Sequence, residues 1–347
     1  MSKQKIMNTI QIKIFPFFFI LTFLICDISY AQKKFDHYFN KLNSTPINDE
    51  EAILSEKIIV NSDKKNKLII SDFAQGKVFL FDQNGKLLES FGRTGRGPGE
   101  FEYLLSAKAL NDTIYTVEFT GDLTFFDKEN NLLKEDKIPL APFSAATHLN
   151  TNQFLLLGKG LGENRIYLAH IYNSEKEIIE KSFFRAPPAD AYGGVLNALG
   201  FLSISSYNPK KDIIASFISS YDTLYIHNTS GEIISKQKIP FQEFKSINNL
   251  KISRSIDDVS NTQMILSKIS RIDKIIWIDN EHLLIQYYNR SSDIGYNDYI
   301  FSLSLINVDS NVLFEIENTP ILHTFLESTN TFLFQNKDAE FFYAKLK

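Results

Sequence analysis

The stretch Phe91–Phe101, FGRTGRGPGEF, holds residue types that could bind an anion: four glycines and two arginines, Arg93 and Arg96. Glycine-rich loops cradle phosphates when Lys and Ser or Thr follow the glycines and a helix begins there. Here a Pro-Gly-Glu sequence stands in that place, and the next segment has the composition of a strand. We therefore predict a turn between two pieces of sheet, with Arg93 and Arg96 as candidate ligand contacts.

Residues for nucleophilic or metal-assisted catalysis form no familiar motif. The chain lacks a Gly-x-Ser-x-Gly elbow and a His-Glu-x-x-His pair, and its one cysteine is Cys26. We expect no catalytic residue, no metal site and no cofactor. Asp82 and Asp127 follow strands and are interpreted as turn residues that bond to their own backbone. His170 and His227 fall within strands of predicted hairpins and are interpreted as structural.

Three irregular stretches interrupt an otherwise regular sequence, and such departures are where ligand sites tend to lie. Arg185–Phe201 has paired prolines and paired glycines beside Tyr192. Phe241–Arg271 either contains a short amphipathic helix or is a connector that only packs. The third stretch, Asn289–Tyr299, combines aromatic faces with polar groups as sugar and peptide sites do, in Tyr296, Asn297 and Tyr299.

The elements that must position these residues are strands. KVFLFDQNGKLL, from Lys77, recurs as DLTFFDKENNLL, LAHIYNSEKEII, TLYIHNTSGEII and SLSLINVDSNVL. Each copy reads as an apolar strand, an Asp or Asn, a polar turn and a second strand, which is a β-hairpin. The first three copies recur at intervals of about 45 residues, the size of a four-stranded propeller blade.

We predict an all-β fold in which residues 32–347 form one domain, a six-bladed β-propeller with four-stranded antiparallel blades. The last blade has only three predicted strands, within Ile321–Ser328, Thr331–Asn336 and Glu340–Lys347. An open blade edge exposes unpaired backbone donors and acceptors. A strand from Phe35–Asn43 should therefore complete this C-terminal blade and close the ring.

The segment Val78–Phe101, VFLFDQNGKLLESFGRTGRGPGEF, resembles the six-bladed β-propeller proteins that Bacteroidetes bacteria export. The terminal FFYAKLK strand is similar as well. These proteins are related in architecture to NHL-repeat and TolB-like propellers. The resemblance implies the fold and export, whereas the activity of the family is largely undefined.

Residues 1–31 have the pattern of a secretory signal peptide: lysines, the apolar run Ile14–Ile25, and small residues before a cleavage site after Ala31. A lipid-anchored outer-membrane form would use Cys26, and it is disfavoured because the residue before Cys26 is a large isoleucine. Cleavage would remove the only cysteine, so no disulfide would hold the fold. We expect a periplasmic or extracellular protein without a transmembrane segment in the mature chain.

The net charge of −4 gives no support to nucleic acid as a partner. We predict a non-catalytic binding propeller that presents loops and a central channel to a protein, or to an extracellular glycan or peptide. The alternative is a metal-dependent NHL-like propeller lyase or hydrolase with its site at the channel, for which the innermost strands offer His148 and His323. A sensor or assembly factor that docks a membrane complex is a third possibility. The oligomeric state is left open.

Overall fold

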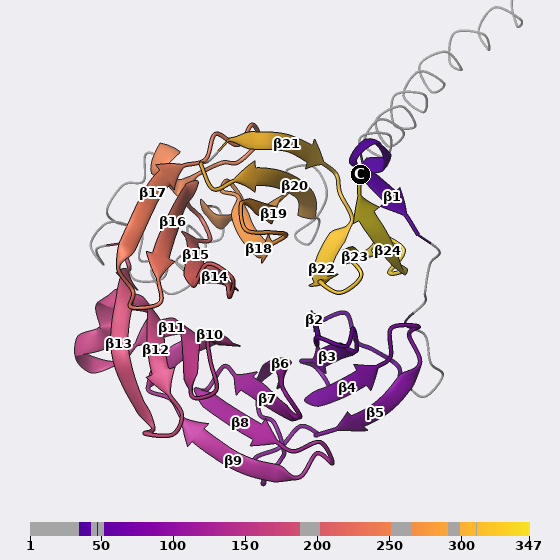
Figure 1. The fold of residues 1–347 in the computed structure, drawn as a ribbon, viewed down its shortest axis with the longest axis vertical. Coiled ribbons are helices and arrows are strands. Elements are labelled where there is room, and N and C mark those ends of the chain that lie inside the picture. Colours follow the sequence, from indigo (N-terminus) through magenta and orange to yellow (C-terminus); the bar gives the residue numbers. More distant parts are fainter. Residues whose placement is uncertain are drawn as a thin grey trace, which may run out of the picture.

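The computed structural model describes residues 35–42, 47, 52–187, 202–250, 265–290, 299–309 and 311–347. These residues form six antiparallel sheets of four strands each, arranged as a ring around one axis (Figure 1). The predicted six-bladed propeller is confirmed. Within the described residues, no helix is long and apolar enough to cross a membrane.

Each of the first five blades begins at the axis and proceeds outward through four consecutive strands. Blade 1 comprises β2 (Ile58–Ser62), β3 (Leu68–Asp72), β4 (Lys77–Phe81) and β5 (Leu87–Phe91). Blade 2 comprises β6 (Leu104–Leu110), β7 (Thr113–Glu118), β8 (Asp122–Phe126) and β9 (Leu132–Lys137). Blade 3 comprises β10 (Leu140–His148), β11 (Gln153–Gly160), β12 (Tyr167–Asn173) and β13 (Ile178–Arg185), with the short 3-10 helix η1 (Gly162–Ile166) before β12.

Blade 4 comprises β14 (Ser203–Asn208), β15 (Ile213–Ile218), β16 (Thr223–Asn228) and β17 (Ile233–Lys238). The link to blade 5 contains the 3-10 helix η3 (Ile247–Asn249). Blade 5 comprises β18 (Arg271–Trp277), β19 (His282–Arg290), β20 (Tyr299–Asn307) and β21 (Val312–Glu317). Blade 6 comprises β22 (Ile321–Leu326), β23 (Thr331–Gln335), β24 (Phe341–Leu346) and, at its outer edge, β1 (Phe39–Lys41).

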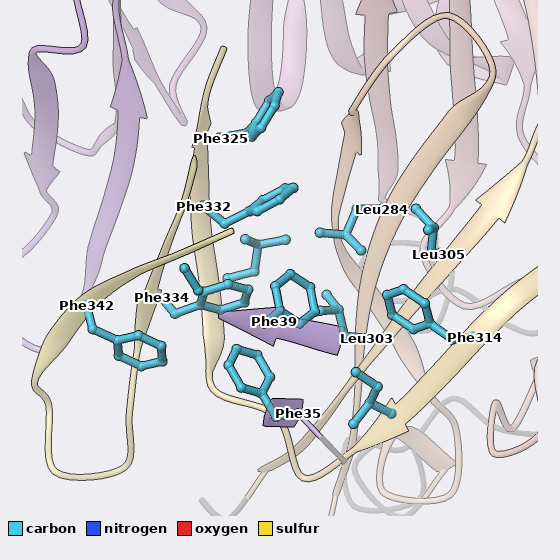
Figure 2. Close-up of a cluster of buried hydrophobic side chains, with 13 residues drawn as sticks. Phe35, Phe39, Leu284, Leu303, Leu305, Phe314, Phe325, Phe332, Phe334 and Phe342 are labelled. Atoms are coloured by element: carbon cyan, nitrogen blue, oxygen red, sulfur yellow. The ribbon is translucent and has the colours of Figure 1, made fainter. Parts of the chain in front are cut away.

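Strand β1 closes the ring as the edge rule predicts. It pairs antiparallel with β24, with Phe39 opposite Leu346. The Phe39 ring is fully buried and lies 5.5 Å from Phe334 of blade 6 and 6.2 Å from Phe314 of blade 5, between centroids (Figure 2). The N-terminal strand therefore joins blade 6 by backbone pairing and blade 5 by ring packing.

The hydrophobic core is divided into six clusters, and each cluster fills the space between two neighbouring blades. Strand β11 shows why. Phe154 and Leu156 pack toward blade 2, whereas Leu155 and Leu157 pack toward blade 4. Because blade strands are buried on both faces, they read as continuous apolar runs, such as FLLL, rather than as an apolar-polar alternation.

The repeated hairpin is the turn between the third and fourth strands of a blade. Asp82 accepts hydrogen bonds from the backbone N–H of Asn84 at 2.8 Å and of Lys86 at 3.0 Å. Asp127 bonds to the backbone of its own turn in the same way, which confirms the turn role predicted for both residues. Each of the five hairpins also carries a register shift just before its Asp or Asn.

Candidate functional site

The ring has two unlike faces. The links between blades and the turns between second and third strands share one face, which we call the connection face. The tight turns that join first to second and third to fourth strands share the opposite face. The chain therefore enters and leaves its three irregular stretches at the connection face.

The glycine-rich segment is the link from β5 of blade 1 to β6 of blade 2, as predicted. Its backbone bonds to itself: Gly95 N–H donates to the Phe101 carbonyl at 3.1 Å, and Gly97 N–H donates to the Glu100 carboxylate at 2.8 Å. Gly92 has φ +80°, and a Cβ there would lie 2.3 Å from the Phe101 ring. The buried Phe101 anchors the loop in the core between blades 1 and 2.

Arg93 and Arg96 project from this loop, and the side chain of each is 81% exposed. Each pairs with a carboxylate at 2.5 Å, Arg93 with Glu100 and Arg96 with Glu102. The pKa of Glu100 is lowered by the Gly97 N–H bond and then by Arg93. The two guanidinium charges are thus balanced locally, and ligand contact by Arg93 and Arg96 stays a prediction.

Tyr299 is the first residue of β20 and also lies at the connection face. Its ring packs against Tyr288 at 4.8 Å, edge to face, and the Arg290 guanidinium lies 5.7 Å over it. The other aromatic and polar candidates, Tyr192, Tyr296 and Asn297, lie outside the described residues. The helix predicted within Phe241–Arg271 begins outside them as well.

Exposed apolar side chains recur on the connection face at one position of the blade. Phe73, Phe119 and Leu161 each follow the second strand of blades 1, 2 and 3, and they are 39%, 50% and 53% exposed. Their backbone N–H groups donate to the carbonyls of Lys57, Tyr103 and Pro139, which precede the innermost strands. At the opposite face, exposed large apolar residues lie at the first position of fourth strands, as Leu132, Ile178 and Ile233 do, rather than in the turns themselves.

The axis of the ring is lined by the six innermost strands, and two of them place a lysine there. Lys108 of β6 donates from Nζ to the Ala146 carbonyl and to Thr147 Oγ1 of blade 3, both at 2.9 Å. Burial and then the Lys274 ammonium lower the pKa of Lys108 to about 8. Burial also lowers the pKa of Lys274 itself, against the opposing effect of Asp273.

The two histidines of the innermost strands, His148 of blade 3 and His323 of blade 6, lie in opposite blades of the ring. His323 is buried, its Nε2 is 3.1 Å from Gln335 Oε1, and burial and Lys274 lower its pKa to about 4. Burial and Lys108 lower the pKa of His148. Among the described residues, no three His, Cys, Asp or Glu side chains are grouped so that they could hold a metal ion.

Lys108 and Lys274 were not among the residues that the sequence pattern singled out. The available signal was a lysine within a strand that the blade repeat assigns to the axis, in LLSAKAL and RIDKIIW. A strand that faces the axis is enclosed by the other blades, so a charged residue in its middle is less expected than on an outer strand.

Comparison with known proteins supports the same architecture. Solved structures that are similar include a member of the DUF4221 family from Bacteroides vulgatus, with a TM-score of 0.68 and 12% identity over 89% of this chain and 98% of that chain. A candidate exported protein from Bacteroides fragilis has a TM-score of 0.62 and 11% identity, over 90% of this chain and 96% of that one. At these identities the likeness shows the fold alone.

A protein of unknown function from Bacteroides caccae is also similar, with a TM-score of 0.51 and 10% identity over 79% of this chain and 88% of that one. No curated protein matches the sequence. The model of the family DUF5128, described as a 6-bladed beta-propeller, matches residues 25–297. This match spans most of the chain, which therefore belongs to the DUF5128 family of six-bladed β-propellers.

Proposed function

We propose that the protein is an exported, non-catalytic binding propeller that holds a partner protein, or an extracellular glycan or peptide, on its connection face. The observation that carries the proposal is the row formed by Phe73, Phe119 and Leu161 in three neighbouring blades. Apolar side chains that cluster on one face of a soluble protein mark interaction sites, and aromatic rings are enriched at the centres of such sites.

The residues around this row have aromatic and charged side chains that are suited to contacting a ligand. Tyr103, which is 45% exposed, shares a backbone hydrogen bond with Phe119. Arg93 and Arg96 lie in the link that leads to Tyr103 and would supply charged donors at the rim, and Tyr299 would supply a further ring. In this proposal Tyr192, Tyr296 and Asn297 belong to stretches that leave the ring at the same face.

Export is part of the proposal. Residues 1–31 would act as the signal peptide, and residues 32–347 would form one mature domain in the periplasm or outside the cell. The similarity to a candidate exported protein of Bacteroides fragilis supports this location. A relation to NHL-like and TolB-like propellers is likewise proposed, on the glycine-rich link and its hairpin.

Site-specific crosslinking tests whether the connection face binds a partner. A photoreactive benzoylphenylalanine replaces Phe119, and a control places it at Lys128, an exposed residue in a turn of the opposite face. We expect a discrete adduct from position 119 and none from position 128 when the protein is irradiated in the cells that produce it. Adducts of equal yield from both positions, or from position 128 alone, would contradict the proposal.

A second experiment tests whether a glycan or peptide ligand binds at the row. The purified protein and a Phe73→Ser, Phe119→Ser double variant are applied to an array of glycans and peptides. For a ligand that uses the row, the double variant should bind at least about tenfold more weakly, because each truncated anchor ring typically costs 1 kcal/mol or more. Equal binding by both proteins would show that the row is not the site.

A further inference from the structure

The innermost strands are positively charged in a protein that is acidic as a whole. Together they contain Lys108, Arg271 and Lys274 against a single carboxylate, Asp273. The net charge of the whole chain is −4. The sequence therefore concentrates cations at the one place in a propeller where surrounding blades restrict solvent and raise the energy of like charges.

Lys108 and Lys274 lie on the innermost strands of two opposite blades. Lys108 belongs to blade 2 and Lys274 to blade 5, which are opposite in a ring of six (Figure 1). Each is partly exposed to solvent although its strand is enclosed by the ring. The charge of Lys274 also lowers the pKa of Lys108, as expected for like charges on opposite sides of one axis.

Lys274 and Lys108 differ in their bonded partners. Lys274 follows directly on a register shift between Ile272 and Lys274, a feature that the innermost strands β6, β10 and β22 share. In the described part of the chain, its ammonium makes neither a hydrogen bond nor an ion pair within bonding distance. Lys108 uses only neutral acceptors of blade 3, and the charge of Asp273 acts on Lys274 without an ion pair between the two residues.

We propose that the ring axis binds a small molecule carrying a carboxylate or phosphate group, held between Lys108 and Lys274. An oxyanion placed between two facing ammonium groups replaces their repulsion with two charge-assisted hydrogen bonds. Asn61 and Thr147, which are partly exposed on the innermost strands β2 and β10, supply neutral polar groups near Lys108. This axial site is separate from the connection face, so either proposal can fail alone.

Calorimetric titration of the purified protein with succinate, and in parallel with inorganic phosphate, tests the site at low ionic strength and pH 7. We expect at least one of the two anions to bind with a dissociation constant of about 1 mM or lower. Lys274→Met and Lys108→Met should each weaken that binding at least about tenfold, whereas Lys274→Arg keeps the charge and should keep the binding. Lys181→Met, on the exposed outer strand β13, is the matched control.

Thermal unfolding without added anion separates a binding lysine from a structural one. Lys274→Met removes a cation whose charged form burial disfavours despite the nearby Asp273, so the melting temperature of the variant should rise by about 2 °C. A fall in the melting temperature of Lys274→Met would assign the side chain a structural role and overturn the proposal. The proposal would also be overturned if neither anion bound, or if Lys274→Met bound the anion as tightly as the wild type.

Discussion

Two buried histidines, His170 and His227, lie in surroundings that suppress their ionisation. His170 is enclosed with Nδ1 2.8 Å from Ser182 Oγ and Nε2 3.2 Å from the Gly158 carbonyl. His227 is fully buried, and its ring contacts those of Phe183 and Phe184 at 5.1 and 5.4 Å. Burial lowers the pKa of each to about 4. The structural role predicted for both residues fits these surroundings.

The pKa of His227 predicts acid sensitivity. The unfolded chain takes up a proton near pH 6.5 and the folded chain only near pH 4, so stability contributed by His227 is full above pH 6.5 and is lost as the pH falls toward 4. Between pH 7.5 and 5 this amounts to about 2 kcal/mol. Urea unfolding measures the free energy of unfolding at the two pH values. Its decrease from pH 7.5 to pH 5 should be smaller by about this amount in His227→Leu than in the wild type.

The leucine variant should also be no less stable than the wild type at pH 7.5, because neither ring nitrogen of His227 makes a well-formed hydrogen bond that leucine would forfeit. His37→Leu, at an exposed position, is the control for loss of a histidine. An unchanged pH dependence in His227→Leu would show that His227 is not the group responsible.

At the scale of elements, side chains tie each innermost strand to its neighbours. Asn61 of blade 1 donates to the Ala107 carbonyl of blade 2 at 3.0 Å, and Ser62 donates to the Phe325 carbonyl of blade 6 at 3.0 Å. Trp277 of blade 5 donates from Nε1 to the Ser206 carbonyl of blade 4, also at 3.0 Å. These bonds hold the axial strands in fixed positions, which is what a binding site at the axis requires.

Of the contacts between elements, the pairing of β1 with β24 that closes the ring should be the one whose loss destabilises the protein most. Phe39→Ala removes a buried ring from the contact between blades 5 and 6 and loosens the only strand that covers the edge of β24. We expect the free energy of unfolding to fall by about 3 to 5 kcal/mol, measured by urea titration. Leu88→Ala, on the exposed side of outer strand β5, should change it by less than about 0.5 kcal/mol. A similar small change in Phe39→Ala would show that the ring does not depend on this strand.

The blades could be predicted from the sequence because they repeat. The Asp or Asn of each hairpin marks the end of a third strand, and the unpaired C-terminal edge required a partner from Phe35–Asn43. The proposed axial site could not be predicted from the sequence, because only the closed ring places Lys108 and Lys274 on opposite sides of one axis. The row of Phe73, Phe119 and Leu161 was not predicted either, because the position of Phe73 directly after a second strand is recognisable only once the strand ends are known.

At the scale of the whole molecule, the proposed apolar row and the proposed anion site occupy different parts of the ring. The connection face carries exposed apolar residues such as Phe119, whereas the axis carries Lys108 and Lys274. A partner on the connection face would lie across the end of the axis, so an anionic group of that partner, or a separate small anion beneath it, could meet the lysines. Competition between succinate and the partner would distinguish these two arrangements.

The affinity of the axial site for succinate should decrease as the pH rises from 7 to 9. Only the ammonium form of Lys108 attracts an anion, and its pKa of about 8 means that most of this charge is lost over that range. Loss of the charge of Lys274 would weaken anion binding in the same way, because burial also lowers the pKa of Lys274. His148 does not contribute, because its pKa is lowered from 6.5 and its ring is neutral over this range. We expect the dissociation constant to rise by up to about tenfold.

Loss of folding would not explain such a decrease. Because the pKa of Lys108 is lower in the folded protein than its ordinary 10.5, deprotonation of this residue favours the folded state between pH 8 and 10.5, so its stability contribution rises while binding falls. Lys108→Arg remains charged at pH 9 and should show a weaker pH dependence than the wild type. Titration calorimetry at pH 7, 8 and 9 measures both proteins. An affinity that stays constant in the wild type would remove Lys108 from the site, because loss of its ammonium charge would then leave binding unaffected.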